Sequence, residues 1–331
     1  MTSKDSRSPS VSIIVPTRNG GVRWEETLRS LLRQNYDGPM ELLVIDSSSN
    51  DGTPSLTEQL CANPMINTAG VTLYLEVIPE STFGHGKTRN AAALRASGAL
   101  IMFLSQDATP GTADWVTTLT QSLQDPSIVG TFCRQLPRPT ATPVERFNLS
   151  QAFPPESRVL DVMSVGAIVP LFSNVANVIR RDTLVQYPFR EDILMSEDQF
   201  WAVDVLREGG KLLYVADTFV LHSHDYGLVT WFRRYFDAGV SSPRDVQVSG
   251  EKGYVDYLTR EARFVVHDSG PFALPGMVVF ECARVLGYML GKRARRLPLW
   301  LCRYLSGSPH WFEQSDSPHV LTHDTAPSDA R

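Results

Sequence analysis

Apolar and polar residues alternate in blocks over the first third of the chain. Four short runs are apolar at nearly every position, namely VSIIV (11–15), ELLVI (41–45), VTLYLEV (71–77) and ALIMFL (99–104). Strands this apolar on both faces, separated by helices, are typical of a mostly parallel sheet covered on each side. The segment between the first two runs is helical in character, because Trp24, Leu28 and Leu31 fall on one helical face. The pattern therefore predicts an α/β fold.

The second half is less regular. FSNVANVIRR (172–181) predicts a short strand with a turn, and SEDQFWAVDVLREGG (196–210) predicts a helix stopped by glycine. KLLYVADTFVLHSH (211–224) predicts a strand or hairpin, and LVTWFRRYFDAG (228–239) predicts a further helix. The remaining chain is helical in pattern and more basic, and both ends are polar and rich in Ser, Asp and Pro. We therefore expect a disordered N-terminus (1–10), an α/β domain (11–244), a helical C-terminal extension (245–312) and a disordered tail (313–331).

Polar residues follow each of the four apolar runs. In parallel sheets, ligands bind beyond the carboxyl ends of the strands. The residues at these ends are Pro16, Thr17, Arg18 and Asn19, then Asp46 and Asp51, then His85, Arg89 and Asn90, and last Ser105, Gln106 and Asp107. They predict one cleft that holds carboxylates, cations and amides.

Composition narrows the class of protein. The chain has 331 residues, of which 42% are hydrophobic and 20% charged, as is ordinary for a soluble enzyme. A net charge of −5 argues against a nucleic-acid-binding protein. The cysteines form no Cys-x-x-Cys pair. The N-terminus MTSKDSRSPS lacks the apolar core of a signal peptide. No uncharged run is long enough to span a membrane. We expect a cytoplasmic protein.

The stretch STFGHGKTRN (81–90) ends like a phosphate-binding P-loop, with Gly86, Lys87 and Thr88. A P-loop also needs a glycine five residues before the Gly-Lys pair, so that backbone N–H groups can close around phosphate. Ser81 stands there instead. A nucleoside triphosphatase would also leave the acidic and histidine motifs further along the chain unexplained, so we interpret the match as a coincidence.

Several short motifs together resemble a known family. The motifs are HGKTRN, SQDATP, FSN, SEDQFWA, HSHDY and FRRYFDAG. In this order and spacing they are similar to inverting family 2 glycosyltransferases of the GT-A fold, and within them to bacterial rhamnosyltransferases. The resemblance covers residues 11 to about 240.

The resemblance implies roles for the residues at the strand ends. Asp46 would accept a hydrogen bond from the pyrimidine ring of a nucleotide sugar, with Asp51 on the same turn. The nucleotide-sugar pocket would further include Pro16, Thr17, Arg18, Asn19, Arg89 and Gln106. Asp107 occupies the metal-binding position of the family's Asp-x-Asp signature, although Ser105 replaces the first aspartate. The alternative for Asp46 and Asp107 is that each caps a following turn.

Chemistry supports a metal at Asp107. A sugar nucleotide's diphosphate leaves with added negative charge, which Mg²⁺ or Mn²⁺ neutralises. His222 or His224 could add an imidazole ligand, which suits Mn²⁺ better. Their spacing puts both on one side of a strand, so geometry does not choose between them. The resemblance favours His222.

The motif SEDQFWA supplies a base. Inverting transfer is one displacement in which the acceptor hydroxyl must lose its proton. The resemblance implies that Asp198 is this base and that Glu197 positions groups or binds acceptor; alternatively, both acids only complement a helix dipole. Trp201 is either an acceptor-stacking platform or part of the core.

These expectations describe a metal-dependent transferase that moves L-rhamnose from dTDP-rhamnose onto a growing bacterial surface glycan. One alternative keeps the fold and uses a UDP-linked hexose or galactofuranose. The alternative from another class is a non-catalytic GT-A module that binds glycan.

The C-terminal region suggests where such an enzyme would work. Residues 272–290 are apolar except for Glu281 and Arg284, and the basic segment 291–305 with aromatic residues follows. This arrangement suits a membrane interface, and a lipid-linked acceptor would lie at the inner face of the cell membrane. The alternatives are that the helix packs on the α/β domain or forms a dimer contact.

Overall fold

The computed structural model describes residues 8–167, 170–224, 226–242 and 251–314. The chain divides into two compact units. The first comprises Met1–Glu191 and Glu197–Asp225, and the second comprises Asp192–Ser196 and Tyr226–Arg331. Most of the predicted disordered ends, residues 1–7 and 315–331, lies outside the described residues. Ser8 to Ser10 are described, and the carbonyl of Pro9 accepts a hydrogen bond from Tyr36 Oη at 2.5 Å.

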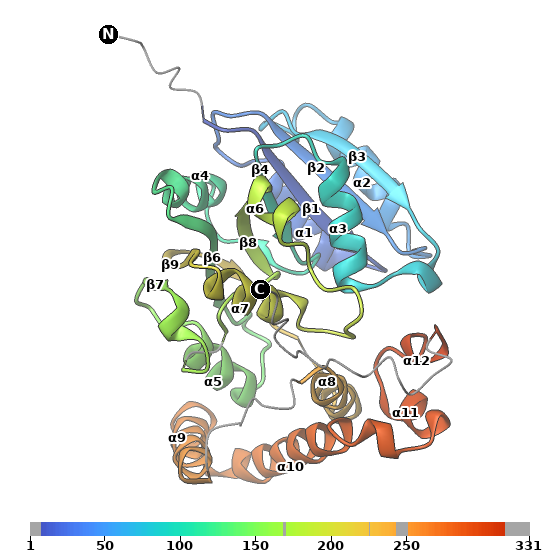
Figure 1. Cartoon of the computed structure of the whole chain (residues 1–331), viewed down its shortest axis with the longest axis vertical. Helices are drawn as coiled ribbons and strands as arrows, with labels where there is room; N and C mark the ends of the chain where they lie inside the picture. Colours follow the sequence, from blue (N-terminus) through green and yellow to red (C-terminus); the bar gives the residue numbers. More distant parts are fainter. Residues whose placement is uncertain (1–7, 168–169, 225, 243–250, 315–331) are drawn as a thin grey trace, which may run out of the picture. The chain divides into compact units, whose positions relative to one another are not determined.

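The first unit is built on one sheet with the strand order β3-β2-β1-β4-β8-β6-β9-β5 (Figure 1). Its first half contains the four predicted strands, β1 (Val11–Thr17), β2 (Met40–Asp46), β3 (Thr72–Val77) and β4 (Leu100–Leu104). These strands are parallel, as the apolar runs predicted. Thr17 pairs with Asp46 in the register of β1 and β2, so the polar strand ends lie together at one edge of the sheet.

The second half of the sheet is largely antiparallel. It contains β5 (Thr109–Pro110), β6 (Ile128–Leu136), β7 (Arg158–Leu160), β8 (Ala176–Arg180) and β9 (Lys211–Leu221). β8 runs antiparallel to both β4 and β6, β9 antiparallel to β5 and β7, and β6 parallel to β9. Because Leu104 at the end of β4 pairs with Ala176 at the start of β8, the segment before β8 reaches the edge that holds the ends of β1 to β4.

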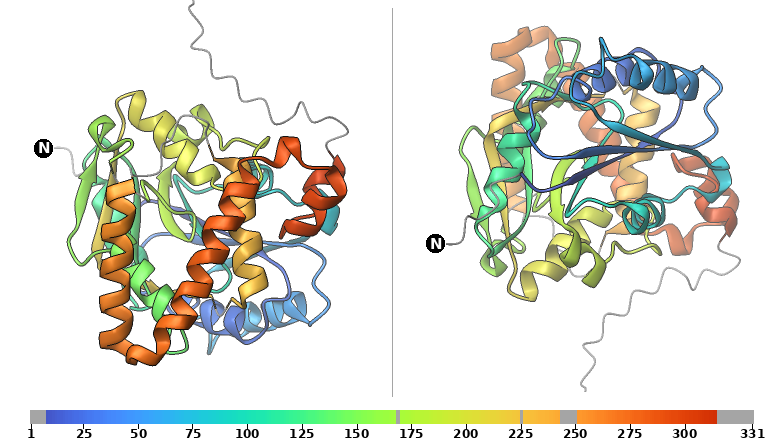
Figure 2. Two further views of the ribbon diagram at one scale, coloured as in Figure 1. Left: turned by 90° about the horizontal axis from the view of Figure 1, so that it is seen from below. Right: turned by 90° about the horizontal axis from the view of Figure 1, so that it is seen from above.

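Helices cover both faces of the sheet (Figure 2). One hydrophobic cluster joins the sheet to α1 (Gly21–Leu31), α2 (Thr53–Ala62) and α4 (Trp115–Gln121). The other joins it to α3 (His85–Arg95), α5 (Pro143–Ala152), α6 (Arg181–Gln186) and α7 (Glu197–Arg207). Short 3₁₀ turns lie at Glu80–Thr82, Ser122–Gln124 and Val162–Ser164. This coverage explains why β1, β2 and β4 are apolar on both sides, whereas Thr72, Tyr74 and Val77 of the edge strand β3 are exposed.

The second unit is helical. It contains α8 (Leu228–Ser241), α9 (Glu251–Ser269), α10 (Leu274–Gly291), α11 (Leu299–Leu305) and α12 (Trp311–Gln314), with 3₁₀ turns at Pro271–Ala273 and Ala294–Arg296. Its core contains Leu194, Phe236, Ala294, Cys302 and Phe312. The helix α8, which the sequence analysis assigned to the α/β domain, thus belongs to the unit of the C-terminal helices.

One helical stretch of the second unit, Pro271–Gly291, has the length and mean hydropathy of a membrane-spanning helix. The sequence analysis expected no such segment, because Glu281 and Arg284 interrupt the apolar run.

Candidate active site

Three predicted metal ligands come together at the carboxyl edge of the sheet. Asp107 follows β4, and His222 and His224 follow β9. Their ligand atoms all lie within 4.8 Å of one another. His222 Nε2 lies 3.6 Å from Asp107 Oδ1, and His224 Nδ1 lies 3.3 Å from Oδ2. Both histidines can thus contribute a nitrogen to one cation, which suits a first-row metal such as Mn²⁺.

A glutamine fixes the orientation of His222. Gln135 Oε1 lies 2.9 Å from His222 Nδ1, while Gln135 Nε2 donates to Ser173 Oγ at 3.0 Å. Because the amide nitrogen is used by Ser173, Oε1 must accept from a protonated Nδ1 of His222. With Nδ1 keeping its proton, Nε2 is the nitrogen that can give up its proton to a metal ion, and it faces Asp107.

The other two members of the cluster are held through their backbones. Arg138, 5% exposed, donates from Nη2 to the carbonyl oxygen of Asp107 at 3.1 Å and from Nη1 to Glu26 at 2.9 Å. Glu145 Oε1 accepts a hydrogen bond from the backbone N–H of His224 at 2.5 Å. These contacts hold the backbones of Asp107 and His224 in position without the help of a metal ion.

The Asp107 carboxyl is held in its ionised form. Burial alone would raise its pKa, but the hydrogen bond with His224 and the charges of His222 and His224 outweigh burial and hold the pKa well below its usual range. An ionised carboxylate beside two imidazoles is a suitable ligand set for a divalent cation.

The predicted acid pair lies at the start of α7, in a polar network. Arg89 Nη1 donates to Glu197 Oε1 at 2.7 Å, and Asn174 Nδ2 donates to the same oxygen at 2.9 Å. The backbone N–H groups of Asn174 and Gln199 donate to the two carboxylate oxygens of Asp198 at 2.9 and 2.8 Å. Glu197 is 5% exposed, whereas Asp198 is half-buried and retains access to solvent.

This network drives the pKa values of the two acids apart. For Asp198, burial and the negative charge of Glu197 outweigh the backbone hydrogen bonds and raise the pKa to about 6. For Glu197, burial would raise the pKa, but Arg89, His85 and Asn174 outweigh it and lower the pKa. Neighbouring carboxyl groups with separated pKa values are typical of catalytic acid–base sites.

Asn174 is a site residue that the sequence analysis did not single out, although it ends the motif FSN. Asn177 Nδ2 donates to Asn174 Oδ1 at 2.9 Å, which turns the Asn174 amide nitrogen toward Glu197. Gln135 and Arg138 were also missed. Neither lies in a motif, and their roles depend on partners far away in the sequence.

Asp46 and Asp51 hold the loops after β1 and β2 together. Asp46 is fully buried, and its Oδ2 accepts from Thr17 Oγ1 at 2.9 Å and from Ser49 Oγ at 2.6 Å. Asp51 accepts from Gly21 N at 3.0 Å and from Thr53 Oγ1 at 2.6 Å, at the start of α2. Both acids therefore stabilise the loops that form the predicted nucleotide pocket.

The remaining predicted nucleotide-pocket residues line the same edge. Asn19 has a positive φ of 45°, and its backbone N–H donates to Ser49 Oγ at 2.7 Å. Gln106 Oε1 accepts from Arg18 N at 2.8 Å and its Nε2 donates to Arg18 O at 3.1 Å, while the Arg18 side chain pairs with Glu80. Pro16 is half-buried at the end of β1. The loops after β1, β2 and β4 thus form one connected rim.

Two sequence features have structural explanations. Trp201 is 1% exposed and its Nε1 donates to Tyr187 O at 2.8 Å, so of the two alternatives it belongs to the core. Gly86 lies in the first turn of α3, where a Cβ atom would collide with the carbonyl of Arg190. This close approach explains the glycine without a phosphate.

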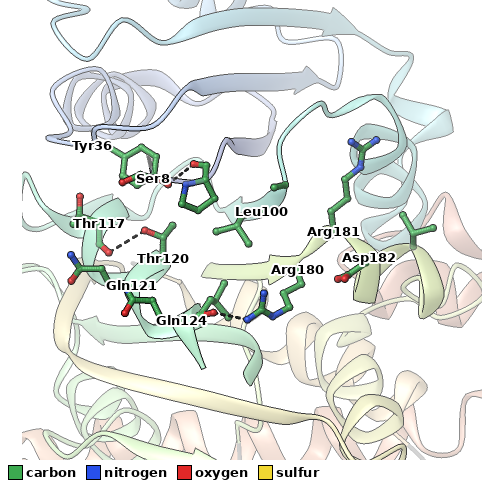
Figure 3. A pocket seen from close by; sticks show the side chains of 14 residues that line it. Ser8, Tyr36, Leu100, Thr117, Thr120, Gln121, Gln124, Arg180, Arg181 and Asp182 are labelled. Atoms are coloured by element: carbon green, nitrogen blue, oxygen red, sulfur yellow. Dashed lines mark hydrogen bonds between the residues drawn. The ribbon is translucent and has the colours of Figure 1, made fainter. Parts of the chain in front are cut away.

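A cavity of about 910 Å³ lies away from these residues (Figure 3). Its lining includes Ser8 before β1, Leu100 at the start of β4 and Arg180 at the end of β8. It is therefore at the opposite edge of the sheet from Asp107. The Arg180 Nε donates to the carbonyl of Ile128 at 2.9 Å and its Nη2 to the carbonyl of Asp125 at 3.1 Å, so this cation holds the start of β6 and the loop before it.

The fold and the site define a glycosyltransferase of the GT-A fold. A family model described as Glycosyl transferase family 2 matches residues 12–181. The chain belongs to this family.

Two curated relatives match nearly the whole chain. The O-antigen chain rhamnosyltransferase RfbN of Salmonella typhimurium is 33% identical over 89% of this chain and 94% of the relative. The O-antigen chain rhamnosyltransferase WbaN of Salmonella anatum is 32% identical over 90% of this chain and 94% of the relative. The family resemblance in the sequence motifs is thus confirmed.

Solved structures confirm the fold. The mannosyltransferase PcManGT from Pyrobaculum calidifontis, in complex with GDP-Man and Mn²⁺, matches with a TM-score of 0.55 and 21% identity over 96% of this chain and 86% of that chain. TarS of S. aureus matches with a TM-score of 0.52 and 17% identity over 86% of this chain and 55% of that chain.

Proposed function

We propose that this protein is an inverting, divalent-metal-dependent transferase that moves L-rhamnose from dTDP-rhamnose onto a hydroxyl of a growing bacterial surface glycan. The observation that carries the mechanism is the Asp107–His222–His224 cluster at the carboxyl edge of the sheet. The two rhamnosyltransferase relatives support the choice of donor. PcManGT, which has the same fold, was solved with a nucleotide sugar and Mn²⁺.

Asp107, His222 and His224 would hold the cation, which when bound supplies neutralising charge for the departing nucleotide diphosphate. In this proposal Asp107 contributes a carboxylate oxygen and His222 contributes Nε2. The hydrogen bond of His222 Nδ1 with Gln135 orients the ring so that Nε2 faces Asp107. Whether the ion is Mn²⁺ or Mg²⁺ depends on how strongly the imidazoles contribute.

Asp198 is the proposed base. Its carboxylate takes the proton of the acceptor hydroxyl as that oxygen attacks the anomeric carbon, in one displacement that inverts the configuration. A raised pKa makes the carboxylate a stronger base than a free aspartate while leaving it ionised near neutral pH. Glu197 is bound to Arg89 and Asn174, so it positions Asp198 rather than taking a proton itself.

The nucleotide would bind at the rim formed by the loops after β1, β2 and β4. This part of the proposal assigns it Pro16, Thr17, Arg18, Asn19, Asp46, Asp51 and Gln106 of the rim, together with Arg89 of α3, whose side chain is paired with Glu197. Asp46 is fully buried, so it would contact the pyrimidine ring only after the turn that carries Ser49 shifts. We propose that binding of the nucleotide opens this turn.

The acceptor in this proposal is a glycan on a lipid carrier, and the enzyme works in the cytoplasm at the inner face of the cell membrane. The names of the two relatives, O-antigen chain rhamnosyltransferases, support a glycan acceptor. The C-terminal helices would provide either a membrane contact or a homodimer contact.

A donor screen tests the function. The purified protein is heated with dTDP-rhamnose, UDP-glucose, UDP-galactofuranose or GDP-mannose, each with Mn²⁺, with Mg²⁺ or with chelator. We expect dTDP-rhamnose with metal to raise the melting temperature most. A larger shift with a UDP-linked sugar would retain the transferase and replace the donor. No shift with any donor would instead favour a non-catalytic glycan-binding module.

A further inference from the structure

The helix α10 has two different faces. The exposed positions Val278, Cys282, Val285, Leu286 and Met289 recur with helical spacing and form one apolar stripe. Val278 is 54% exposed and Leu286 is 55% exposed, and Phe272, just before the helix, is 97% exposed. Among the described residues nothing covers this stripe, and a contiguous exposed apolar patch is typical of an interaction surface.

The opposite face of α10 packs against α8 within the second unit (Figure 1). A Cβ atom at Gly287 would lie 2.5 Å from the carbonyl of Phe232, so the two backbones approach too closely for any other residue. The buried residues of α10 recur on this face; they are Met277, Glu281, Gly287 and Gly291. The two helices therefore form one rigid layer with the apolar stripe on its outside.

The charges inside α10 lie on its packed side. Glu281 is 5% exposed, forms an ion pair with Arg284 and accepts a hydrogen bond from Tyr254 Oη at 3.1 Å. The guanidinium of Arg284 lies 4.8 Å from the ring centroid of Tyr257. The acid and the base thus neutralise each other within the unit, and the exposed stripe is uncharged.

A basic segment continues from the end of the stripe. Residues 291–305 contain Lys292, Arg293, Arg295, Arg296 and Arg303 and no acidic residue. Leu299, Trp300 and Tyr304 in the same segment are 43%, 68% and 68% exposed. Exposed aromatic and basic residues beside an apolar stripe are typical of helices that lie in the headgroup region of a membrane.

Two other environments for the apolar stripe, the interior of a membrane and a second copy of this chain, fit less well. A spanning helix would be surrounded by lipid, but α10 is packed along α8, which carries Arg233, Arg234 and Asp237. In a twofold dimer the same patch meets itself, so the basic segments of two copies would repel each other. An anionic lipid surface complements both the apolar stripe and the positive charge.

We propose that the outer face of α10, together with the basic segment 291–305, binds the surface of an anionic lipid bilayer. The apolar stripe enters the headgroup region while Lys292, Arg293 and Arg296 contact lipid phosphates. The inference deepens the proposed location at the membrane, but it depends on no donor, metal or acceptor. Its failure would therefore leave the proposed transfer reaction untouched.

The test is flotation of the full chain with vesicles of phosphatidylcholine, alone or with about one third phosphatidylglycerol. We expect flotation with the anionic vesicles and release by high salt, because salt screens surface charges. The triple variant Lys292→Gln/Arg293→Gln/Arg296→Gln should partition roughly 100-fold more weakly, at about fivefold per charge removed. The double variant Phe272→Ser/Leu286→Ser should also bind more weakly while retaining salt sensitivity.

The matched control is Arg33→Gln/Arg207→Gln/Lys211→Gln, which removes three exposed positive charges from the first unit. It should float like the unchanged chain. Equal flotation of both triple variants would overturn the proposal, as would equal binding to both vesicle types. Retention of the protein in vesicles after high salt and alkaline washing would show a spanning helix instead. A dimer in sedimentation that Phe272→Ser/Leu286→Ser dissociates, without any vesicle binding, would assign the stripe to a second copy.

Discussion

Arg89 and Glu197, 108 positions apart in the sequence, form a buried ion pair in which Nη1 donates to Oε1 at 2.7 Å. Their side chains are only 8% and 6% exposed. The pair joins α3, which follows the third strand, to the start of α7, which carries the proposed base. It thereby holds Asp198 in place and keeps Glu197 ionised beside it.

Removing Arg89 should destabilise the fold. Arg89→Met leaves the buried Glu197 carboxylate without its counter-charge, so we expect a loss of about 3–5 kcal/mol in the free energy of unfolding. Urea denaturation measures it. The double variant Arg89→Met/Glu197→Gln should recover part of the loss, because the uncompensated charge is gone. A loss below about 1 kcal/mol in the single variant would contradict the pairing.

Asp198→Asn should slow transfer by about 10²–10⁴ while leaving donor affinity nearly unchanged, because the variant cannot take the acceptor's proton. Turnover and the Kd for donor are measured on the same preparation. As a control, Asp204→Asn changes an acid on the same helix that pairs with Arg190, and it should keep turnover near that of the unchanged enzyme. A collapse of donor affinity in Asp198→Asn with turnover intact would make Asp198 a binding residue.

The raised pKa of Asp198 predicts the acid limb of the pH profile. A base must be deprotonated to act, so the rate should fall about tenfold per pH unit below about 6. The negative charge of Glu197 contributes to raising this pKa, so Glu197→Gln should move the limb to lower pH. The rate is measured at saturating donor and metal at each pH. A limb that stays in place in Glu197→Gln would show that another group controls it.

Asp107→Asn should abolish metal-dependent donor turnover while the protein stays folded, because the cluster loses its anionic ligand. Turnover is followed with Mn²⁺, with Mg²⁺ and with chelator, and circular dichroism checks the fold. Full activity of this variant in chelator would rule out the metal mechanism.

Gln135→Leu tests whether the orientation of His222 matters. Loss of a hydrogen bond that orients a metal-bound histidine typically costs 10–100-fold in metal affinity. We therefore expect weaker Mn²⁺ binding by titration, with nearly normal turnover when Mn²⁺ is saturating. His222→Ala should bind Mn²⁺ more weakly still, and unchanged affinity in both variants would remove His222 from the site.

Local pattern was enough to predict the first half of the fold. The four parallel strands are short apolar runs between helices, and the burial of β1, β2 and β4 on both faces requires such composition. The same reasoning placed Asp46 and Asp107 at one edge, because the carboxyl ends of parallel strands lie together. The resemblance of the motifs to the family added Asp198 and His222 to the predicted site.

The tertiary structure decided what depends on pairing between distant segments. The antiparallel placement of β8 beside β4 has no signature in its own residues, since β8 can pair in either direction. That placement brings Asn174 to Glu197 and Ser173 to Gln135, so neither partner could be inferred locally. The separation of the pKa values of Glu197 and Asp198 likewise follows from burial and from Arg89, because adjacent acids in an extended chain would titrate almost alike.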